Sequence, residues 1–335
     1  VRLERLELGE DGWDFELALH ARLQAVCDVE LRRAVKELRA DAASAVVLDP
    51  RSGALLALSS IPSFDPTAPN LVSDERWRLR PVQDAIEPGS TVKPVVAAAA
   101  LAADSVRPGE RFDCRGRGTR LAGFWIRDHV EPGRYTLDEV VAYSANTGII
   151  EIAERIPQED LHRTFAAFGF GRRSGIDYPA ESRGLMPEVR TWSKLSRASF
   201  ALGQELTVTP LQVALAYAAI ANGGWLPEPR LVNSVSAEDW SMPSDRPYRA
   251  RVLDEALASR LTDMLEAVIE EGTGEGARIP GLRVAGKTGT AQRAVNGGFD
   301  DEHHVAWFAG FLPLPDPRLV IVVAVENPRV DFWAS

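Results

Sequence analysis

Cysteine is scarce in this sequence, which has only Cys27 and Cys114 among its 335 residues. Two cysteines cannot form a disulfide framework or a four-ligand zinc site. Long apolar runs are missing as well, because no stretch reaches the roughly 18 to 20 continuous apolar residues of a membrane helix. Internal repeats and low-complexity tracts are also absent. The sequence therefore indicates neither a cysteine-stabilised scaffold nor a repeat array.

Positive charge is in deficit, with 38 Lys and Arg against 48 Asp and Glu, a net charge of -10 and a pI near 5.2. This balance argues against nucleic acid or an anionic membrane surface as the main partner, since both repel negative charge. The hydrophobic share of 45% is typical of a globular chain, and the length allows one large domain or two small ones.

Apolar spacing predicts strands at both ends of the chain and helices between them. Residues 44–60 contain two apolar runs around Asp-Pro-Arg-Ser-Gly, which is typical of a hairpin, and residues 20–39 have the stripe of an amphipathic helix. Residues 225–247 have turn residues without periodicity, as expected for loop or irregular strand. The remaining predicted elements are strands at 282–292, 304–313 and 318–327 and helices at 90–103, 136–155, 158–168, 209–221 and 253–271.

Strands at both ends around a helical middle predict an α+β fold, with one sheet assembled from distant segments and an inserted, mostly helical lobe. We expect the sheet subdomain at about residues 14–85 and 250–335, and the helical lobe at about 86–249. The groove between sheet and lobe is the expected place for a functional site.

A phosphate-loop pattern occurs in residues 281–288, GLRVAGKT, and would suggest a nucleotide hydrolase. That function needs a buried strand before the first glycine and a helix that begins at the Lys-Thr pair. The flanking residues predict loop before the motif and an extended strand within it, so we reject this function. The glycine-rich stretch 272–276, GTGEG, also lacks the helix of a nucleotide site, and no ligand is assigned to it.

Three short segments follow one another along the chain: Ser90-Thr91-Val92-Lys93, Ser144-Ala145-Asn146 and Lys287-Thr288-Gly289. The order S-x-x-K, S-x-N and K-T-G is typical of β-lactamases and penicillin-binding proteins. Each segment alone also fits an ordinary role, namely a capped helix, a turn between helices and an edge strand protected by a lysine. The ordered set is far more specific than any one of them.

The first segment has the residue types of an activated nucleophile. At positions i and i+3 of a helix, Ser90 and Lys93 share one face, so Nζ can take the hydroxyl proton. Lys93 must then be neutral part of the time, which requires a pKa lowered by burial or by nearby cations. At the helix start, free N–H groups would face the oxyanion that forms when Ser90 attacks. Pro94 predicts a tight or distorted first turn.

The second segment interrupts a helical pattern and predicts a tight loop that projects from the helical lobe. Facing Ser90 across the groove, Ser144 could pass a proton to the leaving amine. Asn146 could hold a substrate amide through its donor and its acceptor.

The third segment lies on a predicted strand, where alternation sends Lys287 and Gly289 to one side and Thr288 and Thr290 to the other. Gly289 would leave room for a substrate backbone to lie alongside as an added strand. Lys287 would supply positive field, and the threonine hydroxyls could bind a carboxylate.

Beyond these segments, the sequence resembles the transpeptidase domain of class B penicillin-binding proteins. Segments such as DFELALHARLQAV, IRDHVEPGRYTLDEVVAYSANTGI and GQELTVTPLQVALAYAAIANGG resemble family segments in family order, from about residue 14 to the end. The stretch EPGSTVKP resembles the septal branch more than the elongation branch. The resemblance implies the penicillin-recognising serine acyl-transferase fold, with an antiparallel sheet flanked by helices. Residues 1–13 would be a remnant of the N-terminal pedestal domain or linker, and 14–335 the transpeptidase domain.

The resemblance also implies a role for each motif residue. Ser90 would be the acylated nucleophile and Lys93 its base, with an oxyanion hole made by the N–H groups of Ser90 and Thr290. The other implied roles are proton transfer and substrate positioning for Ser144 and Asn146, polarisation of Ser144 by Lys287, and recognition of the terminal carboxylate by Thr288 and Thr290.

The implied substrates are a donor stem peptide that ends in D-Ala-D-Ala and an acceptor amine on a second stem peptide, and β-lactams would acylate Ser90 as mimics of the donor. No cofactor, metal or nucleic acid is expected. Expected partners are a membrane glycosyltransferase and division proteins. The expected location is the periplasm or the outer face of the cell membrane, with the full-length protein anchored by an N-terminal membrane helix.

Two other functions stay open at this point: a β-lactamase or β-lactam sensor of the same superfamily, and an inactive relative that only scaffolds a division complex. A β-lactamase needs a second base for the deacylating water. Asp128 and Glu131 lie in a predicted loop, and Asp138 and Glu139 on a predicted helix surface, so none is a family-like candidate. The intact set of motif residues argues against an inactive scaffold.

Overall fold

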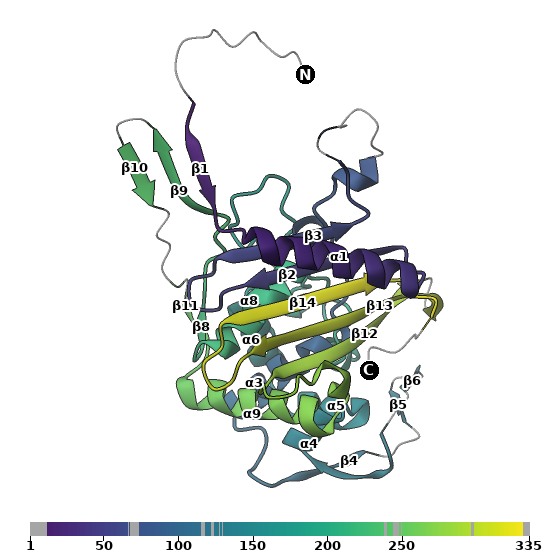
Figure 1. Ribbon diagram of the computed structural model, residues 1–335. Coiled ribbons are helices and arrows are strands. Elements are labelled where there is room, and N and C mark those ends of the chain that lie inside the picture. The colour runs from purple at the N-terminus through teal and green to yellow at the C-terminus, as the bar shows by residue number, and fades with distance from the viewer. Residues whose placement is uncertain are drawn as a thin grey trace.

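The computed structural model describes residues 12–65, 67, 74–114, 118–121, 124–126, 128, 130–237, 240–243, 248, 250–295 and 298–330 (Figure 1). Residues 1–11 of the predicted N-terminal remnant lie outside these ranges. The α-helices are α1 (Ala21–Glu37), α2 (Arg80–Gln83), α3 (Lys93–Ala102), α4 (Leu137–Ala142), α5 (Asn146–Glu154), α6 (Gln158–Ala167), α7 (Ser196–Ala201), α8 (Pro210–Ala221) and α9 (Glu255–Glu271). Short 3₁₀ helices are η2 (Asp74–Trp77), η3 (Gly89–Val92), η4 (Val189–Thr191) and η5 (Glu275–Ala277).

The described strands belong to one central sheet and four small ones. The central sheet contains β2 (Ala42–Leu48), β3 (Leu55–Ile61), β12 (Ala285–Val295), β13 (Gly298–Leu312) and β14 (Leu319–Glu326). The small sheets are formed by β1 (Asp14–Leu17), β9 (Val232–Ala237) and β10 (Trp240–Pro243); β8 (Trp225–Leu226) and β11 (Ala250–Arg251); β4 (Arg111–Cys114) and β7 (Gly133–Thr136); and β5 (Thr119–Leu121) and β6 (Phe124–Ile126).

The central sheet joins both ends of the chain, as the sequence predicts. Its strand order is β12-β13-β14-β2-β3, and every pairing is antiparallel. The pairing of β14 with β2 joins residues 320–326 to residues 42–48. Figure 1 shows the purple N-terminal strands and the yellow C-terminal strands side by side in this sheet. The predicted α+β fold with an antiparallel sheet is confirmed.

Helices cover both faces of the sheet. All seven residues of β2 are buried, which requires protein on either side, because neighbouring side chains on a strand point to opposite faces. Ala43 and Ala45 pack with Leu31 of α1 in one apolar cluster. Val46 and Leu48 belong to the large cluster on the opposite face, which also contains the residues of α8. Figure 1 shows α1 in front of the strands and α8 behind them.

Most predicted helices are present, and two are divided where the site lies. The predicted helix 90–103 becomes η3 followed by α3, and 136–155 becomes α4 and α5 with a break at Ser144. Residues 225–247 contain three short strands, of which β9 pairs with β1, more than 200 positions earlier in the chain. Such a distant pairing leaves little local pattern. Within the described residues, no helix has the length and apolarity needed to cross a membrane.

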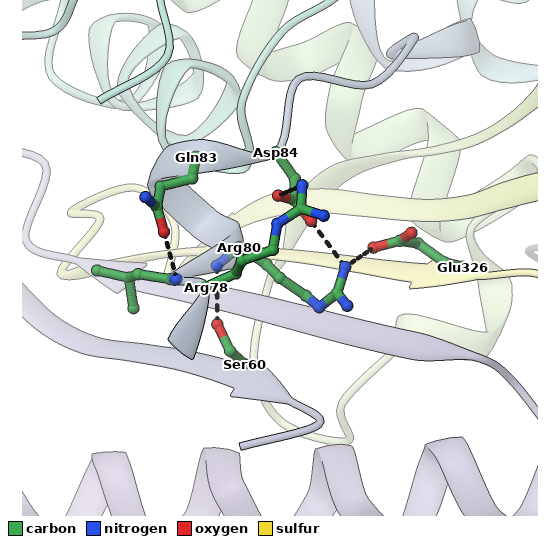
Figure 2. A network of polar contacts seen from close by, with 7 residues as sticks. Ser60, Arg78, Arg80, Gln83, Asp84 and Glu326 are labelled. Atoms are coloured by element: carbon green, nitrogen blue, oxygen red, sulfur yellow. Dashed lines mark hydrogen bonds and ion pairs between the residues drawn. The ribbon is translucent and has the colours of Figure 1, made fainter. Parts of the chain in front are cut away.

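A buried ion network fixes the segment that leads to the first motif (Figure 2). Arg80 of α2 is 7% exposed, and its Nη1 lies 2.7 Å from Asp84 Oδ2 and 3.1 Å from Glu326 Oε1 of β14. Arg78 also pairs with Asp84, and the Arg80 backbone N–H donates to Ser60 Oγ of β3. Burial raises the pKa of Glu326, and the Arg80 charge opposes that shift. The network therefore ties α2 to two strands of the sheet.

We predict that Arg80→Ala lowers the free energy of unfolding by about 3–5 kcal/mol, because it removes the ion-pair partner of the partly buried Glu326 and one of the two cations that pair with the buried Asp84. Urea denaturation followed by circular dichroism measures the change. Arg33→Ala is the control, since the Arg33 side chain is 63% exposed in its pair with Glu30 and such a pair contributes about 0–1 kcal/mol. Equal losses in the two variants would contradict this account of the network.

Candidate active site

Ser90 lies in the 3₁₀ turn η3, directly before α3 begins at Lys93. Pro94 occupies the first turn of α3, where a missing N–H costs nothing because those groups have no helical partner. The tight turn predicted at Pro94 is confirmed, because the 3₁₀ turn η3 directly precedes it. Ser90 itself is half-buried, and its hydroxyl makes no hydrogen bond with any other described residue.

Two buried aromatic side chains hold this turn in place. Trp307 of β13 donates from Nε1 to the carbonyl oxygen of Glu87 over 3.1 Å. Tyr217 of α8 donates its hydroxyl to the carbonyl oxygen of Thr91 over 2.9 Å. Both rings are about 1% exposed, so the sheet and α8 fix the backbone on either side of Ser90.

Glycines let the turn lie directly against the edge strand β12. Gly89 has φ +55°, and a Cβ there would lie 2.7 Å from the carbonyl oxygen of Thr290. On the strand, a Cβ at Gly289 would lie 2.9 Å from Thr91 Cγ2. Gly289 is expected from the sequence to make room for a substrate backbone. That expectation is wrong, because the turn that carries Ser90 occupies the space beside Gly289.

Lys93 joins the first and second motifs. Its side chain is fully buried, and Nζ donates to the carbonyl oxygen of Ser144 (2.6 Å), to Ser144 Oγ (3.1 Å) and to Asn146 Oδ1 (2.8 Å). Three acceptors satisfy the three donors of an ammonium group. The structure thus brings Lys93 together with Ser144 and Asn146, which lie 51 and 53 positions after it in the sequence.

Burial lowers the pKa of Lys93 from 10.5 to about 7, although the nearby Asp128 carboxylate and the Cys114 thiol act in the opposite direction. A buried ammonium loses its hydration, so the neutral amine is favoured. At neutral pH, a large fraction of Lys93 is then an amine that can accept a proton. This meets the requirement set for a base at this position.

The loop that carries Ser144 is a tight break between α4 and α5, as predicted. Ser144 has φ +59°, a left-handed backbone conformation that is uncommon for a residue other than glycine. The N–H groups of Ser144 and Ala145 donate back to the carbonyl oxygens of Val141 and Val140 at the end of α4. This turn directs the Ser144 carbonyl and hydroxyl oxygens at Lys93.

Asp128 supports the same loop, whereas its sequence context suggests only a comparison with the second base of a β-lactamase. Its carboxylate is buried and accepts hydrogen bonds from the N–H of Asn146 (3.0 Å) and of Thr147 (2.9 Å), and from the Thr147 hydroxyl. These N–H groups begin α5, whose own N-cap residue, Ala145, has no side-chain acceptor. A helix start without a capping side chain is the signal that could have revealed the need for a distant carboxylate.

The third motif lies on β12, so no helix begins at Lys287, and the rejection of a phosphate loop is confirmed. Lys287 and Gly289 are buried, whereas Thr288 and Thr290 are half-buried, in agreement with the predicted alternation. Lys287 Nζ donates to Thr273 Oγ1 (3.3 Å) and to the carbonyl oxygen of Thr288 (3.2 Å). A direct bond to Ser144, which the implied polarisation suggests, is not found among the described residues.

Burial lowers the pKa of Lys287 well below its usual value, and the charge of Lys93 lowers it further. The charge of Lys93 therefore acts on Lys287, which links the helical side of the site to the sheet side. Among the described residues, no cluster of three or more His, Cys, Asp or Glu side chains could hold a metal ion.

Comparison with known proteins agrees with this geometry. Residues 43–335 match the family model described as the penicillin binding protein transpeptidase domain. The chain belongs to this family. Its β12, η3 and Ser144 loop are thus elements of a class B transpeptidase domain.

Relatives of this transpeptidase domain include Stage V sporulation protein D of Bacillus subtilis strain 168, which is 35% identical over 334 residues, covering 96% of this chain and 50% of that protein. Peptidoglycan D,D-transpeptidase FtsI of Escherichia coli K12 is 34% identical over 318 residues, covering 95% of this chain and 52% of that protein. The chain thus spans about half the length of these curated relatives.

Solved structures are similar as well. Penicillin binding protein 3 of Mycobacterium tuberculosis, complexed with aztreonam, has a TM-score of 0.89 and 32% identity, covering 95% of this chain and 74% of that chain. The apo TP domain of penicillin-binding protein 3 from Burkholderia pseudomallei has a TM-score of 0.82 and 30% identity, covering 93% of this chain and 88% of that chain. These likenesses support the penicillin-recognising fold expected from the sequence.

We predict that the rate of acylation by a β-lactam rises with pH through about 7, because the neutral form of Lys93 accumulates as pH rises through its pKa. Below that value the rate should fall about tenfold per pH unit, as expected for one essential base. Stopped-flow measurement of acylation from pH 5 to 9 checks this. A flat profile, or a midpoint near 10, would contradict the assignment of Lys93 as the base.

We predict that Asp128→Asn moves this midpoint to lower pH, because the Asp128 charge raises the pKa of Lys93. The plateau rate should also fall, since a neutral amide is a weaker acceptor for the N–H groups that begin α5. The same pH profile measures both effects. Asp138→Asn serves as the control, because Asp138 is half exposed on α4 and pairs with Arg260. An unchanged midpoint in Asp128→Asn would show that its carboxylate does not act on Lys93.

Proposed function

We propose that this chain is the catalytic domain of a D,D-transpeptidase that cross-links peptidoglycan stem peptides through an acyl-enzyme on Ser90. The observation that carries the proposal is the buried Lys93 amine, which lies three residues after Ser90 and is bonded to Ser144 and Asn146. The stretch EPGSTVKP favours the septal branch over the elongation branch.

In the proposed acylation, neutral Lys93 takes the proton of the Ser90 hydroxyl, and Oγ attacks the carbonyl carbon of the D-Ala-D-Ala bond. The backbone N–H groups of Ser90 and Thr290 would stabilise the oxyanion. The close approach of Gly89 to Thr290 supports the pairing of the Ser90 and Thr290 N–H groups, because Gly89 directly precedes Ser90 and brings η3 into contact with β12. Terminal D-Ala then leaves after its nitrogen receives a proton through Ser144, which contacts Lys93.

The remaining motif residues would bind the donor peptide. Asn146 would hold a peptide amide, and Thr288 and Thr290 would bind the terminal carboxylate on the half-buried side of β12. Lys287 would add positive field from beneath the strand. The acceptor amine of a second stem peptide then attacks the acyl-enzyme and completes the cross-link.

A β-lactamase is the competing function, and three of the four carboxylates considered for it have other roles. Asp128 accepts three hydrogen bonds at the start of α5. Glu139 belongs to the capping box of α4 with Thr136, and Asp138 pairs with Arg260 on the surface. These roles leave none of the three carboxylates placed to activate a water for deacylation. A long-lived acyl-enzyme is therefore favoured.

Location and partners follow from the same proposal. Peptidoglycan lies outside the cytoplasmic membrane, so the domain would act in the periplasm or on the outer face of the cell membrane. Residues 14–335 would form the transpeptidase domain, and 1–13 would connect it to a pedestal domain and a membrane anchor in the full-length protein. A membrane glycosyltransferase and division proteins would be its partners.

We predict that a fluorescent penicillin labels Ser90 and no other residue, because Ser90 is followed at i+3 by the buried amine. Mass spectrometry of the labelled peptide identifies the site, and Ser90→Ala should abolish labelling. Thr262→Ala is the matched control on α9, where the hydroxyl bonds only to the helix backbone among described residues. Label on Ser144 would refute the assignment.

The lifetime of the adduct separates the two functions. A transpeptidase excludes the hydrolytic water until an amine arrives, so the penicilloyl enzyme should persist for minutes to hours. Excess unlabelled drug stops further labelling, and intact mass then follows the decay. Release within seconds would favour a β-lactamase.

A further inference from the structure

Thr273 follows the C-terminal end of α9 and contacts two residues of the third motif. Its Oγ1 lies 3.3 Å from Lys287 Nζ and 2.8 Å from Thr288 Oγ1. Neighbours on a strand point to opposite faces, so a side chain that reaches both must lie at the open edge of β12. β12 is an edge strand of the central sheet, and α9 packs against it.

The backbone around Thr273 is fixed to the helix that precedes the Ser144 loop. The Thr273 N–H donates to the carbonyl oxygen of Ala142, the last residue of α4, over 3.3 Å. A Cβ at Gly272 would lie 2.2 Å from the same oxygen, so glycine is required for this close approach. The position of Thr273 is thus coupled to both sides of the site, namely β12 and the end of α4.

Either threonine can donate in the bond between Thr273 and Thr288, and one of the two directions suits a bound carboxylate. A hydroxyl has one proton to donate and can accept two bonds. In that direction, Thr273 Oγ1 accepts from Lys287 Nζ and donates its own proton to Thr288 Oγ1. Thr288 Oγ1 then accepts that bond, and its own proton points elsewhere. With this arrangement of protons, the half-buried Thr288 hydroxyl is a donor toward an incoming group.

From this chain of bonds we infer that Thr273 is a positioning residue that keeps the Thr288 hydroxyl as a donor to the carboxylate of the substrate. It also transmits the polarisation of Lys287 to that hydroxyl, because linked hydrogen bonds in a low-dielectric site strengthen one another. The inference rests on the proposed function, in which Thr288 binds the terminal carboxylate. It gives the glycine-rich stretch 272–276 a role that the sequence did not indicate.

The experiment compares acylation by benzylpenicillin, which carries the carboxylate, with acylation by its methyl ester, which lacks the negative charge. In Thr273→Val, which keeps the shape but removes the hydroxyl, the second-order rate constant for benzylpenicillin should fall about tenfold to a hundredfold, as for loss of a hydrogen bond that serves a charged group. The ester should lose far less. Thr273→Ser should restore the preference for benzylpenicillin, and Thr262→Val within α9 should leave both rates unchanged.

Acylation by the ester also reports whether Thr273→Val is folded. If that variant is unfolded by circular dichroism, Thr273→Ala removes the same hydroxyl with a smaller side chain and repeats the test. Equal losses for the two compounds, no loss for either, or no rescue by serine would overturn the inference and leave acylation of Ser90, and with it the proposed function, intact. Absence of acylation in the wild-type protein by both compounds would overturn both.

Discussion

Burial of the Lys93 amine is the constraint on which the site depends. A fully buried ammonium is costly unless its donors are satisfied, and here the Ser144 loop and Asn146 supply all three acceptors. Those acceptors are in place because Ser144 adopts a left-handed conformation between α4 and α5. The Asp128 carboxylate in turn holds the start of α5. The same burial lowers the pKa of Lys93 to about 7, so one packing arrangement gives both the structure of the site and its basicity.

The nucleophile turn is positioned from the opposite direction. Trp307 and Tyr217 bind its backbone carbonyl groups from β13 and α8, and Arg80 ties the preceding segment to β14. Glycine at position 89 brings the turn against β12. The turn that carries Ser90 is therefore held by the sheet and α8, whereas the Ser144 loop is held by the end of α4. The chemistry requires both parts to stay packed together, and the hydrogen bonds of Lys93 cross between them.

The sequence predicts the sheet, the breaks in both helices and the motif residues, because each leaves a local pattern. Alternation identifies β12, a continuous apolar run identifies β14, and Pro94 marks the distorted turn before α3. The supporting contacts leave no such pattern. Asp128 and Thr273 act on groups 14 or more positions away, and the pairing of β1 with β9 spans most of the chain. Gly289 is a further example of a contact that sequence does not predict. The sequence shows that this strand position is small, but not that the nucleophile turn packs against it.

The most direct test of this account is the pKa of Lys93 itself. Lysine labelled with ¹³C at Cε gives a chemical shift that follows protonation, and Lys93→Arg identifies the signal by its absence. The expected midpoint for Lys93 in the folded protein is about 7. A midpoint near 10 for Lys93 would contradict the claim that burial makes this residue a base at neutral pH.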